Sequence, residues 1–69
     1  MDEKTALVAF LNHPDPETLA ELAETLEEQP GAEALVKFAA RSVYLEDERL
    51  ERLLEEAVRE ARHLLEVLS

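Results

Sequence analysis

Apolar residues recur every three or four positions along most of the chain, which is the spacing of one face of an α-helix. In the first two segments they are Ala6, Leu7, Phe10 and Leu11, followed by Leu19, Leu22, Ala23 and Leu26. The pattern predicts two short helices over about residues 2–11 and 16–28. We therefore expect an all-α fold.

Residues 12–16, Asn-His-Pro-Asp-Pro, separate these two helices. Asn12 can adopt the left-handed conformation that ends a helix, and His13 is kept out of helical geometry because a proline follows it. Asp15 also precedes a proline and has the side chain of an N-cap, and Pro16 then occupies the first helical position. No second histidine, serine or cysteine lies near His13 in the sequence, so the segment is interpreted as a corner and not as a catalytic or metal site.

Gln29, Pro30 and Gly31 form a second break, since proline fixes one backbone dihedral and glycine accepts a positive one. No glycine or proline follows, and the pattern from residue 32 to 68 is helical throughout. Its apolar positions alternate at spacings of four and three, as in a heptad seam. The seam consists of Val36, Ala40, Val43, Asp47, Leu50, Leu54, Ala57, Ala61, Leu64 and Leu68, with Asp47 as its one charged member.

We expect a continuous or kinked helix over residues 32–68, because residues 44–48 contain no glycine, proline or asparagine to mark a corner. Such a helix would be far longer than usual, so a split into helices 32–44 and 47–68, with Asp47 as N-cap, remains open. In both forms residues 1–69 make one small helical bundle, with two short N-terminal helices and a long C-terminal helix that is kinked or split near residues 45–47.

The charge is unevenly distributed along the chain, whose net charge is -10. Residues 1–31 carry eight acids and one base, and residues 32–69 carry nine acids and six bases, which gives 17 and 7 in total. A negative field repels phosphate backbones and anionic lipid, so we expect no nucleic-acid partner and no membrane association. With no cysteine and no apolar stretch longer than residues 6–11, we expect a cytoplasmic protein, or a soluble one expressed heterologously.

Chemistry-bearing motifs are weak. Glu60 and His63 match the Glu-x-x-His spacing by which helical bundles hold two metal ions, with Glu56 one turn earlier, but the pattern occurs once where two copies are needed. One glycine rules out a glycine-rich phosphate loop, and no histidine partner accompanies the hydroxyl groups of the predicted helices, Thr18, Thr25 and Ser42. We expect no catalysis, no cofactor, no metal and no small-molecule substrate.

Residues 35–45 are the strongest candidate for a contact surface, because they are apolar almost all round the predicted helix. Such a helix is either central to the core or in contact with a partner, and tyrosine and arginine beside aliphatic residues are typical of interface hot spots. Two short helices would also leave the C-terminal part of the seam bare, which predicts a homodimer. The candidate interface residues are Phe38, Arg41, Tyr44, Leu45, Leu54, Ala57, Ala61, Leu64 and Leu68.

Two resemblances add to this interpretation. Residues 7–26, LVAFLNHPDPETLAELAETL, resemble the two-helix unit of HEAT repeats, in which an Asp-Pro turn joins two helices, and this implies protein binding along a helical surface. The proline-based caps, acidic helix exteriors and alanine–leucine core positions resemble de novo designed helical bundles. We predict a non-catalytic interaction or scaffold protein that associates with itself or binds another protein. The alternative is a natural, acidic, HEAT-like adaptor module that binds a protein.

Overall fold

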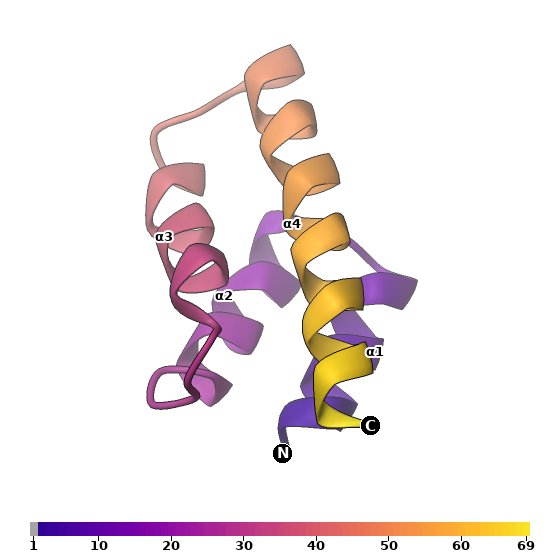
Figure 1. The fold of residues 1–69 in the computed structure, drawn as a ribbon. Coiled ribbons are helices and arrows are strands. Elements are labelled where there is room, and N and C mark those ends of the chain that lie inside the picture. The colour runs from indigo at the N-terminus through magenta and orange to yellow at the C-terminus, as the bar shows by residue number, and fades with distance from the viewer. Residues whose placement is uncertain (1) are drawn as a thin grey trace.

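A computed structural model describes residues 2–69 of the chain. It contains the four helices α1 (Glu3–Asn12), α2 (Pro16–Thr25), α3 (Glu33–Ser42) and α4 (Asp47–Leu68) (Figure 1). The all-α class and the long C-terminal helix are confirmed, and the C-terminal half is split into two helices.

The helices form a closed ring in which each contacts its two neighbours. α1 packs on α2 and α4, and α3 packs on α2 and α4. Figure 1 shows both chain ends at the same end of the bundle. The 22 residues of α4 correspond to about 33 Å of helix, which matches the 32 Å long axis of the molecule. α4 therefore spans the whole long axis of the molecule, and each of the other three helices, with 10 residues, spans about half of it.

Side chains cap the first two helices. The carboxylate of Asp2 accepts a hydrogen bond from the backbone N–H of Thr5 at 2.7 Å, and that of Asp15 accepts one from the N–H of Thr18 at 2.9 Å. The Thr18 hydroxyl oxygen in turn accepts from the N–H of Asp15 at 3.2 Å, which completes a capping box. Pro16 is the first residue of α2, as the sequence predicted.

The corner between α1 and α2 forms without the left-handed residue that we expected at Asn12. Asn12 is the last residue of α1, and His13 follows it as the C-cap with a φ of -138°. The backbone N–H of His13 donates to the carbonyl of Ala9, and the N–H of Asp15 donates to the carbonyl of His13. Because Pro14 already forces His13 out of helical geometry, a positive φ is not needed to end the helix.

The second turn is longer than predicted. α2 ends at Thr25, and residues 26–28 form a turn where we expected helix. Leu26 has left helical geometry (φ -94°, ψ 8°), yet its side chain is fully buried, so burial of this leucine is retained although the helix stops. Gly31 has a φ of 90°, the positive dihedral that the sequence predicted there.

The expectation of a continuous or kinked helix over residues 32–68 is wrong, and the chain takes the split form that the sequence left open. α3 ends at Ser42, and residues 43–46 lead back to α4, which runs beside α3 (Figure 1). Glu46 is extended and is the N-cap of α4, with no side-chain capping hydrogen bond. Asp47, which we considered as the N-cap of a split helix, is instead the first helical residue and has a left-handed φ of 52°. Aspartate is one of the few residues that tolerate this region.

Burial of the apolar side of α4 accounts for the break. Ala57 and Ala61 are fully buried, and Leu64 is 5% exposed, because α4 lies against both α1 and α3. Burying one leucine side chain stabilises the fold by about 1.5–3 kcal/mol, whereas one left-handed residue costs about 1–2 kcal/mol. A straight helix would avoid the cost of the left-handed residue, but it would lose the larger stabilisation from burying Leu64 and its neighbours.

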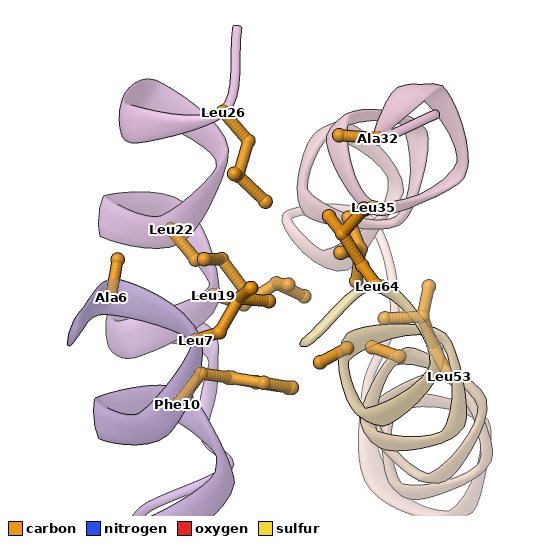
Figure 2. Close-up of a cluster of buried hydrophobic side chains, with 12 residues drawn as sticks. Ala6, Leu7, Phe10, Leu19, Leu22, Leu26, Ala32, Leu35, Leu53 and Leu64 are labelled. Carbon is orange, nitrogen blue, oxygen red and sulfur yellow. The ribbon is translucent and has the colours of Figure 1, made fainter. Parts of the chain in front are cut away.

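The core draws on all four helices and on the turn between α2 and α3 (Figure 2). Its members are Ala6, Leu7, Phe10, Leu19, Leu22, Leu26, Ala32, Leu35, Leu53, Ala57, Ala61 and Leu64. The predicted apolar faces of the first two helices are confirmed in their main members. In Figure 2 the side chains of α1 and α2 point across the bundle toward those of α3 and α4.

The predicted seam is wrong within α3. Val36 is half-buried, and Ala40 and Val43 are exposed, while Leu35 and Ser42 are the buried residues of the helix. The hydroxyl of Ser42 donates to the carbonyl of Ala39 at 2.7 Å, so its burial leaves no unpaired polar group. The heptad pattern assumed one helix through residue 47. Because α3 ends at Ser42, the positions before and after the break do not lie on one face of a single helix.

Candidate protein-binding surface

The nine predicted interface residues fall into three groups. Ala57, Ala61 and Leu64 belong to the core of the single chain, so a partner cannot reach them while the bundle is closed. The half-buried members, which pack against the core from outside, are Phe38, Leu45, Leu54 and Leu68. Arg41 and Tyr44 are exposed. The bare apolar stripe on which we based the homodimer is therefore covered by the chain itself, and the dimer stays a prediction without that support.

Three of the nine residues line one groove between α3 and α4. Phe38, Arg41 and Leu45 come from α3 and the link after it, and α4 supplies the rest of the lining. We call this hollow of about 190 Å³ the arginine groove, and its lining consists of Phe38, Arg41, Leu45, Arg49, Arg52, Leu53 and Glu56. Leu53 is buried, and Phe38 and Leu45 are half-buried, so the groove has an apolar floor.

Sequence reasoning missed Arg49 and Arg52 as parts of this site. In a continuous helix these residues would lie two turns or more beyond Arg41, along the same rod. The return of the chain at residues 43–46 instead brings the first turns of α4 beside the end of α3. The spacing of three between Arg49 and Arg52, which places them on one side of a helix, was the available sign.

The groove is locally positive on an otherwise acidic chain. Its lining contains three arginines and one acid, whereas the whole chain carries 17 acids against 7 bases. All three arginine side chains are exposed, so their guanidinium groups are open to a ligand. A guanidinium presents a planar set of N–H donors that can form bidentate hydrogen bonds with a carboxylate or a phosphate. The site can therefore hold an anionic group beside an apolar one.

Two exposed hydrophobic residues lie next to the groove in the link between α3 and α4. Val43 is 76% exposed and Tyr44 is 85% exposed. The link backbone is held by two hydrogen bonds, from the N–H of Tyr44 to the carbonyl of Arg41 and from the N–H of Leu45 to the carbonyl of Ser42. Val43 and Tyr44 thus project into solvent from an anchored backbone.

Leu54 lies on the other flank of α4. It lines a shallow hollow with Pro14, Glu51, Glu55 and Val58, beside the corner between α1 and α2. Two acids border this hollow and no base does. The two hollows share no lining residue, so Leu54 is not part of the arginine groove.

The hydroxyl groups considered for catalysis hydrogen-bond to the backbone, and the two histidines lie on the surface. The hydroxyls of Thr18, Thr25 and Ser42 donate to backbone carbonyls of His13, Glu21 and Ala39 respectively. His13 and His63 are both exposed. Within residues 2–69, no group of three or more His, Cys, Asp or Glu side chains is placed to hold a metal ion.

The length of α4 raises the question of a membrane span. Its 22 residues include eleven charged side chains from Asp47 to Glu66, counted along the helix sequence DERLERLLEEAVREARHLLEVL without the histidine. In the part of the chain that the structure describes, no helix combines the length and the apolar character needed to cross a bilayer.

Comparisons of the chain with protein-family models, with characterised proteins and with solved structures find no match. The function is therefore inferred from the surface itself.

Proposed function

We propose that this protein is a non-catalytic protein-binding module. Its contact surface consists of the arginine groove together with Val43 and Tyr44. The observation that carries the proposal is the exposure of Tyr44, at 85%, beside a groove lined by three arginines. Tyrosine and arginine are enriched among the residues that dominate binding energy at protein interfaces.

The exposed pair in the link supports this assignment because Val43 and Tyr44 are more exposed than Val8 and Val67, the other large hydrophobics on the surface of the described residues. Single exposed hydrophobics are common on protein surfaces, but Val43 and Tyr44 are consecutive and lie between Arg41 and Leu45, which line the arginine groove. The link needs neither side chain for its own packing. A partner would remove both from water and gain their transfer free energy.

The size of the chain limits the kind of interface. A stable complex buries about 800 Å² on each partner, and that would be about one sixth of the 4874 Å² surface of this chain. The groove and link are confined to one end of the bundle. We therefore propose a small, reversible interface and not a permanent one.

The HEAT-like adaptor remains the second candidate, and it uses a different surface. In support of this candidate, residues 7–26 span most of α1, the corner and α2, and the two helices pack against each other. Its outer side has a shallow hollow lined by Lys4, Thr5, Val8, Ala9 and Asn12, in which Val8 is 44% exposed. A HEAT-like module would bind along this side of α1.

The resemblance to designed bundles stays a prediction. The capping box of Asp15 and Thr18 and the proline at the start of α2 fit it. The left-handed Asp47 departs from it, because idealised designs avoid positive φ at residues other than glycine.

Photocrosslinking separates the two candidate surfaces. Benzoylphenylalanine is placed at Tyr44 in one chain, at Val8 in a second and at Val67, which is 64% exposed on α4, in a third. Our proposal predicts adducts from position 44 that disappear when Arg41→Ala is added. Adducts from position 8 alone would favour the HEAT-like module, and equal labelling at all three positions would contradict both. Mass spectrometry of the adduct shows whether the partner is a second copy or another protein.

A further inference from the structure

We propose that the arginine groove binds an acidic peptide segment, whose carboxylates pair with Arg41, Arg49 and Arg52 while an apolar side chain of the same segment enters between them. This inference rests on the proposed function and names the class of partner.

The arrangement of charge favours a carboxylate-bearing ligand. Arg41 reaches the groove from α3, and Arg49 and Arg52 reach it from the first two turns of α4. Glu56 is the one acid in the lining, so the lining has a net charge of +2, from three arginines minus one glutamate. Within the lining the arginines therefore outnumber the acids, and further carboxylates can be accommodated there.

The floor of the groove selects for an apolar anchor beside the carboxylates. Phe38, Leu45 and Leu53 form the apolar part of the lining. The volume of about 190 Å³ is below the roughly 300–1,000 Å³ typical of small-molecule pockets. One side chain of a peptide fits such a hollow better than a whole metabolite does.

The surroundings of the groove favour a short acidic segment over a long polyanion. The first turn of α4 begins with Asp47 and Glu48, and Glu51 and Glu55 lie on the flank of α4 away from α3. A nucleic acid that extended beyond the groove would meet these acids and be repelled. A short peptide can place its carboxylates on the three arginines alone.

A second copy of the chain is a less favourable occupant. Its α2 has an acidic exterior that could in principle reach the arginines. However, two chains of charge -10 repel each other before they meet, and the screening length at physiological salt is about 8 Å. A small peptide of charge near -4 experiences much less of this repulsion.

The test uses the full chain and two six-residue peptides, EELFEE and its uncharged match QQLFQQ, both with blocked ends. Binding is followed by amide NMR shifts and by fluorescence anisotropy of labelled peptide. We expect EELFEE to shift the amides of residues 38–45 and 49–53 and to bind about tenfold more tightly than QQLFQQ. Equal affinity of the two peptides, or shifts centred elsewhere in the bundle, would overturn the proposal.

A matched pair of variants isolates the role of the arginines. Arg49→Gln with Arg52→Gln should weaken EELFEE binding about tenfold, while Arg59→Gln with Arg62→Gln, which removes the same charge further along α4 and outside the groove, should leave it unchanged. Helical circular dichroism and thermal midpoints establish that both variants fold. Equal loss in the two variants would show that net charge is responsible and would contradict a specific site.

Further measurements test whether something other than an acidic peptide occupies the groove. Tighter binding of inorganic phosphate or of a single-stranded oligonucleotide than of EELFEE would overturn the peptide. A mass that rises with concentration in light scattering, with groove amides shifting in the absence of peptide, would assign the groove to a second copy. If position 44 crosslinks a protein while EELFEE fails to bind, the proposed function stands and this inference fails. Peptide binding without any adduct would support the groove as a site for acidic peptides and would contradict Tyr44 as part of the contact surface.

Discussion

Asp15 and Thr18 hold the start of α2 through reciprocal hydrogen bonds, and His13 contributes to the same corner only through its backbone. The N–H of His13 donates to Ala9 and its carbonyl accepts from Asp15, while its side chain is exposed. At the residue scale, then, the corner depends on one carboxylate and one hydroxyl. The imidazole has no structural partner to lose.

This difference predicts opposite outcomes for two neighbouring substitutions. Asp15→Ala should lower the free energy of unfolding by about 1 kcal/mol, the usual value of an N-cap, because N–H groups of the first turn lose their acceptor. His13→Ala should change it by less than about 0.5 kcal/mol. Urea denaturation of both variants measures the two values, and a larger loss for His13→Ala would show that the histidine has a role beyond the corner.

The N-cap of α1 predicts a pH dependence. Hydrogen bonding from Thr5, chiefly from its backbone N–H, lowers the pKa of Asp2 from the ordinary value of 3.8. Because the folded pKa is below the unfolded one, this carboxylate stabilises the fold fully above about pH 5 and loses its effect as the pH falls below 3.8.

Asp2→Asn keeps a capping oxygen but cannot titrate. The difference in unfolding free energy between the unmutated chain and this variant should be constant above about pH 5 and should shift in favour of the variant at lower pH. Thermal unfolding from pH 2 to 7 measures it. Parallel pH profiles of the two proteins throughout that range would contradict the assignment.

At the scale of elements, the break between α3 and α4 depends on one unusual residue. Asp47, the first residue of α4, has a φ of 52° directly after a link without glycine, whereas a continuous helix would give it ordinary helical geometry. A positive φ favours glycine over alanine, and a helix interior favours alanine over glycine by about 1 kcal/mol. At position 47, glycine should therefore be more stable than alanine in the broken form of the chain, and alanine should be more stable than glycine in a continuous helix.

We predict that Asp47→Gly is more stable than Asp47→Ala by about 1 kcal/mol. Both variants lose the same charge, so its interaction with the helix end cancels in the comparison. At Glu55, an exposed position in the middle of α4, the alanine variant should be the more stable one. Chemical denaturation of the four variants gives the ranking, and an alanine preference at both positions would indicate a continuous helix.

At the scale of the whole molecule, the C-terminal stripe decides between a closed monomer and an association through α4. Leu64 is 5% exposed and packs near Gly31 in the turn between α2 and α3. Small domains are stable by only a few kcal/mol, so placing a charge in this position can exceed the whole stability. The same charge in a dimer interface would separate the subunits and leave each helical.

Leu64→Asp should therefore abolish cooperative unfolding and most of the helical circular dichroism at 25 °C, since an unpaired buried carboxylate costs at least about 3 kcal/mol. Val67→Asp, one turn further along and 64% exposed, should change stability by less than about 0.5 kcal/mol. Light scattering of the unmutated chain, whose mass is 7.8 kDa, provides the companion measurement. A dimer that Leu64→Asp converts into helical monomers would support association through the stripe.

Local features of the sequence were enough to predict the corner at residues 12–16, the positive φ of Gly31 and the buried faces of α1 and α2. Each depends on residues within one or two turns of each other: a cap with its N–H groups, a proline with the residue before it, or an apolar spacing of three and four. Such interactions are nearly the same in any fold that contains the segment. Phe38, Arg41, Tyr44 and Leu45 were also singled out locally, from their composition.

The break at residues 43–46, the buried face of α3 and the arginine groove were decided by the tertiary structure. Local preference allows both a straight and a broken helix at Asp47, because neither glycine nor proline is present. The free energy that separates the two comes from burying Ala57, Ala61 and Leu64 against α1 and α3, which are distant in sequence. Once the chain turns back, Arg49 and Arg52 line the same groove as Arg41. The spacing of apolar residues along the chain does not predict this proximity.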